Sequence, residues 1–263
     1  MERNLQCLLG KMALVCLGLG VLVGCGGPAP TGTGVQTPKA PATMEPMPSP
    51  PKVERATVRF LTEDKIELVG WVYGQGKTTA VICLHMYPES RKDWESSAPF
   101  LAARGYMVLA FDFRGFGESG GQYSGEEGLE KDVLAGMEYV KAQGAKKIVL
   151  MGASMGSTMS LLVAAKKGVA AVVAMSPWYG TFLGGTLTLS KESVEQVRAP
   201  KLFIASEEDS GVGTREVYRD AKTPKEIHVY PGSDHGTRIF DGPYGGDLVE
   251  RIVEFLDRYV GVG

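Results

Sequence analysis

The segment Gly152–Gly156 constrains the fold of this chain more than any other stretch. It reads Gly-Ala-Ser-Met-Gly, a G-x-S-x-G pattern with the serine at position 154. Residues 147–151 before it form an apolar run typical of a buried strand, and residues 157–167 after it are rich in helix-forming residues. A serine on a sharp turn between strand and helix has an exposed hydroxyl, and the small glycines let neighbouring backbones approach. The pattern therefore predicts a nucleophile, Ser154.

A serine hydroxyl is a weak nucleophile at neutral pH, so Ser154 needs a general base and a group that orients the base. Without these partners the pattern is only a glycine-rich turn with no chemistry. The chain has three histidines, His85, His228 and His235. His228 lies in an alternating, strand-like run and is predicted to be structural. His235 follows in the loop 231–236, which can present an imidazole at the edge of a sheet, so we predict that it is the base.

The orienting acid is expected between the serine and the histidine, after another strand. Residues 201–206 have the composition of that strand, and the acidic residues Glu207, Glu208 and Asp209 follow it. Serine, acid, histidine is the chain order of the catalytic residues in α/β-hydrolases.

Three further segments resemble segments of the α/β-hydrolase family. They are Leu84–Tyr87 at the end of a strand, Asp112–Ser119 with the pattern D-x-R-G-x-G-x-S, and Ile204–Asp209 after the later strand. In the family the first segment usually reads His-Gly-x, and Met86 stands here in place of that glycine. The resemblance covers about residues 53–260.

The resemblance implies both a fold and a mechanism. The fold is a mostly parallel twisted sheet of about eight strands with helices on both faces, which the alternation of strand and helix patterns also favours. The catalytic residues are Ser154, His235 and Asp209, the acid being assigned by the family spacing. The backbone N–H groups of Tyr87 and Met155 form the oxyanion hole. This chemistry requires no cofactor and no metal ion.

Residues 176–200 lie where many members of the family insert a cap domain. About two dozen residues are too few for a large cap, so we predict none. The segment carries Trp178, Tyr179, Phe182 and Leu183. These side chains either wall the pocket or pack on the core.

Four other classes of site are disfavoured. Residues 115–120 fit G-x-G-x-x-G, but a dinucleotide site needs a helix at the third glycine, and the next helix is expected only over 126–143. Residues 70–78 lack the glycine spacing of a P-loop. A net charge of −2 gives no reason to expect nucleic acid, and no Cys/His cluster suggests zinc. The one cysteine of the domain, Cys83, is predicted to be a small buried hydrophobic residue.

The N-terminus resembles a bacterial lipoprotein signal peptide. After a positively charged start, residues 12–23 form an apolar region too short to span a bilayer. Residues 22–25, Leu-Val-Gly-Cys, resemble a lipobox. We therefore expect residues 1–24 to be removed and Cys25 to carry lipid. A plain secretory signal or an uncleaved anchor is the alternative.

The rest of the chain divides in two. Residues 25–52 are dense in Pro, Gly, Thr and Ala and are predicted to be an extended tether. Residues 53–263 are predicted to be the catalytic domain. The expected location is the bacterial cell envelope, where the lipid on Cys25 anchors the chain to a membrane and the catalytic domain lies outside the cytoplasm.

These patterns predict a serine hydrolase that cleaves small-molecule carboxylic esters with small or medium acyl chains. A serine peptidase, a thioesterase or a cofactor-free perhydrolase would use the same three residues. A binding lipoprotein without catalysis belongs to a different class. It is disfavoured because a binding pocket has no use for a base and a group that orients it.

Overall fold

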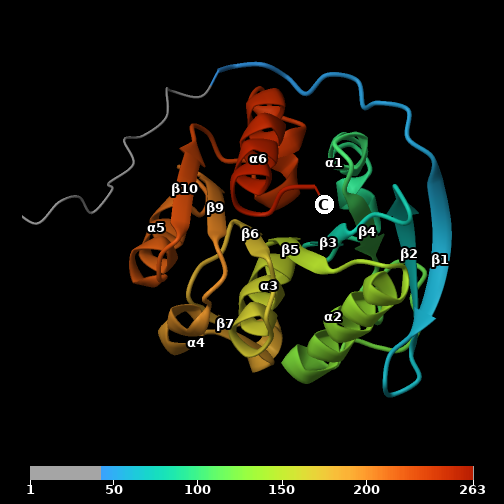
Figure 1. Cartoon of the computed structure of the whole chain (residues 1–263). Coiled ribbons are helices and arrows are strands. Elements are labelled where there is room, and N and C mark those ends of the chain that lie inside the picture. The colour runs from blue at the N-terminus through green and yellow to red at the C-terminus, as the bar shows by residue number, and fades with distance from the viewer. Residues whose placement is uncertain (1–42, 263) are drawn as a thin grey trace, which may run out of the picture. The chain divides into compact units, whose positions relative to one another are not determined.

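The computed structural model describes residues 43–262, and these residues belong to one compact unit. Its centre is an eight-stranded sheet with the order β1-β2-β4-β3-β5-β6-β9-β10 (Figure 1). The strands from β4 to β10 are parallel, and β2 runs antiparallel to both of its neighbours. This sheet confirms the predicted fold class. The predicted signal peptide and Cys25 lie outside the described residues.

The strands of the sheet are β1 (Arg55–Leu61), β2 (Glu67–Tyr73), β3 (Thr79–Leu84), β4 (Met107–Phe111), β5 (Lys147–Ala153), β6 (Ala171–Met175), β9 (Lys201–Ser206) and β10 (Lys225–Tyr230). The helices are α1 (Ala98–Ala103), α2 (Gly125–Ala142), α3 (Met155–Lys166), α4 (Lys191–Gln196), α5 (Gly211–Asp220) and α6 (Gly245–Tyr259). Three 3₁₀ segments complete them, η1 (Arg91–Trp94), η2 (Leu183–Gly185) and η3 (Gly236–Phe240). None of these helices is long and apolar enough to cross a membrane.

Side chains of the sheet alternate between two hydrophobic cores. In β3, Ala80, Ile82 and Leu84 belong to one core and Val81 and Cys83 to the other, and all five are fully buried. Helices α2, α3, α4 and α5 close the first core, and α1 and α6 close the second (Figure 1). Cys83 is the small buried hydrophobic residue that the sequence predicts.

The helical segment between β3 and β4 is divided into two short pieces. The short turn η1 ends at Trp94, and α1 begins only at Ala98. Pro99 lies in the first turn of α1, where its missing N–H costs no hydrogen bond, and it could not lie in a helix interior. The proline therefore fixes where α1 begins.

No large cap covers the carboxyl edge of the sheet in the segment 176–200. It forms a small antiparallel hairpin, β7 (Gly180–Phe182) and β8 (Leu187–Leu189), with η2 at its tip, followed by α4. Leu187 and Leu189 are buried against the first core. The hairpin is thus fixed to the domain by its second strand.

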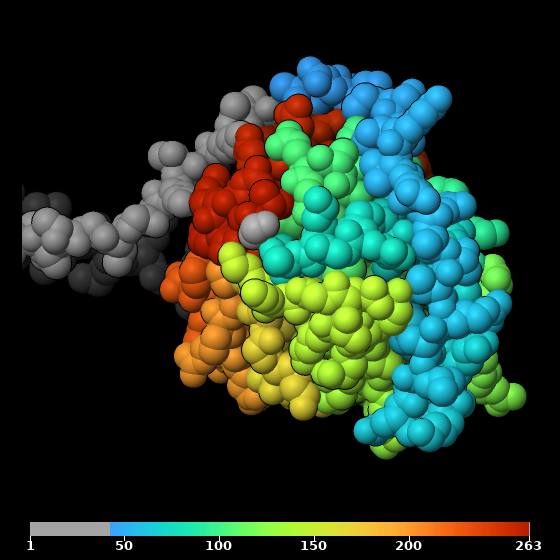
Figure 2. Space-filling view, turned by 45° about the vertical axis from the view of Figure 1, so that its right-hand side comes forward, coloured from blue at the N-terminus to red at the C-terminus, as the bar shows by residue number. Residues whose placement is uncertain are grey.

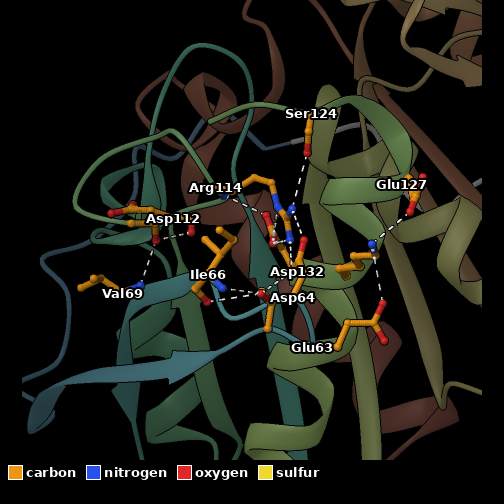
Figure 3. A network of polar contacts seen from close by, with 12 residues as sticks. Glu63, Asp64, Ile66, Val69, Asp112, Arg114, Ser124, Glu127 and Asp132 are labelled. Carbon is orange, nitrogen blue, oxygen red and sulfur yellow. Dashed lines mark hydrogen bonds and ion pairs between the residues drawn. The ribbon is translucent and has the colours of Figure 1, made fainter. Parts of the chain in front are cut away.

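A network of ion pairs holds the turn that follows β4 (Figure 3). The backbone N–H and Nε of Arg114 donate to the carboxylate of Asp132 on α2, each at 2.8 Å. The terminal nitrogens of Arg114 donate to Asp64 at 2.8 and 3.0 Å, and this hydrogen bonding holds the pKa of Asp64 well below its usual value. Asp132 is fully buried and Asp64 lies in the turn between β1 and β2. The network therefore fastens the β1–β2 hairpin and α2 to the sheet.

The G-x-G-x-x-G pattern at 115–120 is part of the same turn. A Cβ atom on Gly117 would lie 2.1 Å from Oδ2 of Asp112, so only glycine fits beside that carboxylate. Oδ2 also accepts the N–H of Glu118 at 2.8 Å, and the Ser119 hydroxyl donates to the Asp112 carbonyl at 2.6 Å. Packing around Asp112 accounts for the pattern, without a nucleotide.

The described part of the predicted tether lies on the domain. The carbonyl of Glu45 accepts the N–H of Gly246 at 2.9 Å, and the N–H of Thr43 donates to Asp247 at 3.4 Å. Met47 packs on the second core, and Figure 2 shows this blue segment over the red surface of α6. The first N–H groups of a helix have no partner within it, so Glu45 caps α6. We call residues 43–47 the N-terminal clasp.

Candidate active site

Ser154 lies on the turn between β5 and α3, as the sequence predicts. Its φ of 50° and ψ of −112° are rare for a residue with a side chain. A Cβ atom on Gly152 would lie 2.1 Å from the carbonyl oxygen of Gly156, and one on Gly156 would lie 2.1 Å from that of Leu84. Both glycines are therefore required for the close approach of α3 to β5 and β3. This packing fixes Ser154 at the carboxyl end of β5.

His235 and Asp209 are hydrogen-bonded to each other, with 2.8 Å between Nδ1 and Oδ2. They follow β10 and β9, which are neighbouring parallel strands. Burial raises the pKa of Asp209, but hydrogen bonds, led by that from His235, together outweigh burial and hold the pKa below its usual value. An ionised carboxylate can only accept, so the proton lies on Nδ1 of His235. Its Nε2 is then an acceptor.

The loop with His235 lies against the turn with Ser154. A Cβ atom on Gly236 would lie 3.1 Å from the Cβ of Ala153, the residue before the serine. The ring of Trp178 lies 5.8 Å from the imidazole of His235, and Trp178 lines the same cavity as Ser154. The structure thus brings the three predicted catalytic residues to one edge of the sheet.

Ser154 borders a cavity of about 150 Å³. Most of its lining side chains are apolar; the lining residues are Tyr87, Ser154, Met155, Thr158, Trp178, Phe182, Leu183 and Leu187. The β7–β8 hairpin and η2 supply one wall through Phe182, Leu183 and Leu187. Of the aromatic residues predicted either to wall the pocket or to pack on the core, Trp178 and Phe182 wall it. The hydroxyl of Tyr179 instead donates to Asp220 at 3.3 Å.

Tyr87 and Met155, the residues predicted to supply the oxyanion hole, both line this cavity. Neither backbone N–H donates a hydrogen bond to any of the described residues. Met155 is the first residue of α3, where an N–H has no acceptor within the helix. Both N–H groups are therefore without an acceptor among residues 43–262.

Buried polar groups hold the loop before Tyr87. His85 accepts the N–H of Phe113 at Nε2 (3.1 Å), and its Nδ1 donates to the carbonyl of Met86 (2.8 Å). Burial lowers the pKa of His85 to about 4, so this imidazole is neutral and structural. The carboxylate of Asp93 faces the N–H of Met86 at 3.4 Å, and burial raises the pKa of Asp93 to about 7.

Met86 fills the space beneath the loop with His235. Its side chain is buried, and its sulfur accepts the hydroxyl of Thr237 at 3.7 Å. A Cβ atom on Gly236 would lie 3.1 Å from this sulfur, and Gly236 has a φ of 57°. Glycine at position 236 therefore makes room for the methionine that replaces the family's usual glycine.

The two other acidic residues after β9 are directed elsewhere. Glu207 forms an ion pair with Arg215 on α5, with one of its hydrogen bonds at 2.9 Å. Glu208 is exposed, and its backbone N–H donates to the carbonyl of Gly232. Within residues 43–262, Asp209 is the carboxylate that is hydrogen-bonded to His235.

Two other titratable residues, Asp220 and His228, do not line the cavity. Asp220, on α5, is paired with Lys191 at 3.6 Å. His228, on β10, packs edge-to-face against Tyr230 with ring centroids 4.4 Å apart, in agreement with its predicted structural role. In the described part of the chain, no three or more His, Cys, Asp or Glu side chains gather so as to hold a metal ion.

Ser176 is a residue of the site that the sequence does not predict, and it contacts both Asp209 and the loop with His235. Its hydroxyl donates to Asp209 at 3.3 Å and accepts the N–H of Gly236 at 3.0 Å. The only available signal is its position at the carboxyl end of the buried strand β6, where side chains face the site. Ser206 has the same position on β9, and its hydroxyl donates instead to the carbonyl of Asp234.

Comparisons with known proteins agree with the fold and with a hydrolase enzyme. Residues 79–200 match the family model described as alpha/beta hydrolase fold. An uncharacterized protein of Mycobacterium tuberculosis is 28% identical over 216 residues, covering 73% of this chain and 76% of its own. The alpha/beta hydrolase domain-containing protein aho-3 of Caenorhabditis elegans is 30% identical over 166 residues, covering 57% and 48%. The structure of the Pyrococcus furiosus esterase Pf2001 is similar with a TM-score of 0.67 at 25% identity, covering 80% of this chain and 99% of the esterase.

Proposed function

We propose that this chain, an enzyme of the α/β-hydrolase superfamily, is a serine esterase that cleaves carboxylic esters with small or medium acyl groups. The observation that carries the proposal is the placement of Ser154 in a small apolar cavity beside the hydrogen-bonded pair of His235 and Asp209. The similarity to a solved esterase supports the choice of reaction.

In the proposed mechanism, the Ser154 oxygen attacks the carbonyl carbon of the ester while Nε2 of His235 takes the hydroxyl proton. His235 then gives this proton to the leaving alcohol as the carbon–oxygen bond breaks. Water, activated by the same nitrogen, releases the acid from the serine. Asp209 keeps the other proton of the imidazole on Nδ1 and stabilises the imidazolium that forms twice in the cycle.

The backbone N–H groups of Met155 and Tyr87 are the proposed donors to the oxyanion. Among residues 43–262 neither has another partner, so no hydrogen bond within this part of the chain has to break when the tetrahedral intermediate forms. The loss of one such donor typically costs 10²–10³-fold in kcat. The macrodipole of α3, whose N-terminus lies at Ser154, favours the same negative charge.

The size of the cavity limits the acyl group. A cavity of about 150 Å³ is comparable with engineered protein cavities that bind one benzene molecule. Its wall is apolar apart from Ser154, Thr158 and the Tyr87 hydroxyl. A short aliphatic or a phenyl acyl group fits this space, and a long fatty acyl chain exceeds it.

The proposal is tested by a fluorophosphonate probe together with a panel of substrates. We expect the probe to label Ser154 covalently, and we expect the protein to hydrolyse short-chain p-nitrophenyl esters. Peptide, thioester and peroxide-dependent assays on the same preparation distinguish a peptidase, a thioesterase and a perhydrolase. Labelling without ester turnover would reject the esterase and retain a serine hydrolase.

Leu187→Ala is expected to move the preference toward longer acyl chains. This side chain lines the cavity, so its loss lengthens the space beside Ser154. We expect the ratio of kcat/KM for an octanoyl ester to that for a butanoyl ester to rise at least about tenfold, because a methylene in a pocket is worth about 1–3 kcal/mol. Series of p-nitrophenyl esters measure this ratio.

Leu189→Ala is the matched control. Leu189 lies on the same strand with the same burial, 1% of its surface exposed, but it does not line the cavity. Leu189→Ala should lose about as much stability to unfolding as Leu187→Ala does, and its kcat/KM should depend on acyl chain length as in the wild type. An equal change of profile in both variants would mean that the hairpin acts through its stability and not as a wall.

We also propose that the chain is a lipoprotein of the bacterial cell envelope, since residues 22–25 match a lipobox at the end of an apolar leader. Cys25→Ser is expected to remove the protein from the membrane fraction or to leave it as an unprocessed precursor, because the thiol carries the lipid. Fractionation and the mass of the mature N-terminus measure this. A Cys25→Ser protein that is processed and membrane-bound as before would contradict the anchor.

A further inference from the structure

Ser176 is a buried serine in an unusual backbone conformation beside the candidate catalytic residues. It directly follows β6, the strand between β5 and β9 in the sheet. Its φ is 51°, in the left-handed region that residues with side chains seldom adopt, and its backbone N–H donates to the carbonyl of Ile204 at 2.7 Å. This conformation places the residue at the carboxyl edge of the sheet between Ser154 and Asp209.

The hydroxyl of Ser176 connects two separate loops of the site. It donates to Oδ2 of Asp209 at 3.3 Å, the same oxygen that is bonded to His235. It accepts the backbone N–H of Gly236, the residue next to His235, at 3.0 Å. One hydroxyl supplies one donor and two acceptors, so a single serine can make both contacts.

We propose that Ser176 is a positioning residue whose hydroxyl group fixes the carboxylate of Asp209 and the loop of His235 relative to each other. The proposal rests on the proposed catalytic roles of those two residues. Ser176 does not line the cavity, so it acts through its neighbours and not through the substrate. It holds the Oδ2 oxygen in one orientation, and it holds the backbone that carries the imidazole.

The two contacts have different effects on the imidazole. A carboxylate can rotate about its Cβ–Cγ bond, and the donation from Ser176 to Oδ2 restricts this rotation while leaving a lone pair for Nδ1 of His235. The contact with Gly236 fixes a residue whose φ of 57° and packing on Met86 already allow little movement. Loss of the hydroxyl therefore loosens the orientation of the imidazole toward Ser154 without emptying the cavity.

Ser176→Gly and Ser176→Ala test the proposal. Glycine accepts the left-handed conformation without strain, so it removes the hydroxyl with the least cost to the backbone. We expect kcat toward a short-chain ester to fall about 10- to 100-fold in both variants, as for a lost hydrogen bond to a charged group, with KM within about twofold of the wild type. Titration with a fluorophosphonate counts the active sites, so that a fraction of unfolded protein is not mistaken for a lower kcat.

Ser160→Ala is the matched control. Ser160 is fully buried in α3, and its hydroxyl makes one hydrogen bond, to the carbonyl of Gly156 at 2.8 Å. It contacts neither loop of the site, so its kcat should stay within about twofold of the wild type. A loss in Ser160→Ala equal to that in the Ser176 variants would mean that any buried hydroxyl matters, and it would overturn the specific role.

A double-mutant cycle shows whether Ser176 acts through Asp209. In the background of Asp209→Asn, Ser176→Gly should change kcat less than about threefold, because the carboxylate that it orients is already absent. Fully multiplicative losses, with Ser176→Gly costing as much in the Asn background as in the wild type, would overturn the proposal.

The Nδ1 proton of His235 gives a readout that does not depend on turnover. Its NMR resonance, assigned by its loss in His235→Gln, reports the hydrogen bond to Asp209, and we expect Ser176→Gly to shift it. A shift in a protein that hydrolyses no ester would retain the positioning role and reject the proposed function. An unchanged resonance together with unchanged kcat in Ser176→Gly would reject the positioning role alone.

Discussion

Replacing Ser154 by alanine is expected to lower ester turnover on the order of 10⁶-fold and to abolish labelling by a fluorophosphonate. The hydroxyl oxygen forms the bond to the acyl carbon in the proposed mechanism, and alanine has no nucleophile at this position. Alanine keeps the Cβ atom and leaves the close contacts of Gly152 and Gly156 intact. We therefore expect the unfolding temperature to stay within a few degrees of the wild type, as measured by circular dichroism.

Ser160→Ala serves again as the control, since it removes a buried hydroxyl from α3, the helix that directly follows Ser154. It should retain labelling and turnover. The residual rate of Ser154→Ala should still exceed that of water, because the two backbone donors and the cavity remain. Turnover near that of the wild type in Ser154→Ala would place the active site elsewhere in the molecule.

Asp209→Asn is expected to lower kcat on the order of 10⁴-fold, by analogy with other serine–histidine–acid sites. The amide has nearly the shape of the carboxylate, but its NH₂ group donates a hydrogen bond to Nδ1 of His235. The imidazole proton then lies on Nε2, and this nitrogen can no longer accept the proton of Ser154. Steady-state kinetics on a short-chain ester measures the loss.

Glu207→Gln and Glu208→Gln are the matched controls for this carboxylate. Glu207 is paired with Arg215 and Glu208 is exposed to solvent, so each is expected to change kcat less than about threefold. A crippling effect of Glu208→Gln, with Asp209→Asn near the wild type, would show that the acid is Glu208. The pairing of Ser154 with His235 would survive that result.

The turn at Ser154 could be predicted because its physical causes are local. A strand pattern, a helix pattern and two glycines determine it, and all lie within about twenty residues of the chain. The close contacts of Gly152 and Gly156 with neighbouring backbone explain why the pattern requires glycine at both positions. The central strands of the sheet are equally visible, since their burial on two faces gives continuous apolar runs.

The choice among three adjacent carboxylates needed the fold. Neighbouring residues after a strand point in different directions, so sequence alone could only favour Asp209 through the family spacing. The structure places its carboxylate 2.8 Å from His235 and directs Glu207 to Arg215. Ser176 could not be found at all, because a left-handed conformation at a serine leaves no mark in the sequence.

Two other features could not be predicted from their local sequence. The β7–β8 hairpin has strands of three residues each, too short for a periodic pattern. The N-terminal clasp has the composition of an unfolded linker. It is held in place by a hydrogen bond from the N–H of Gly246, about 200 residues later, which has no acceptor within its own helix. The composition of a segment indicates how much apolar surface the segment can bury by itself. It does not indicate which distant helix end the segment can cap.

If Cys25 is lipidated, as proposed, the N-terminal clasp limits how far the domain can lie from the membrane anchor. If the free chain ran from a lipidated Cys25 to Val53, its fully extended length would reach about 100 Å. With residues 43–47 bound to α6, the free part of the tether would end at Thr43, and its fully extended length would not exceed about 65 Å. It also joins the domain where α6 begins, shortly after the loop with His235. On the proposal that Cys25 is lipidated, the tether would therefore meet the domain at the start of α6 and not at β1.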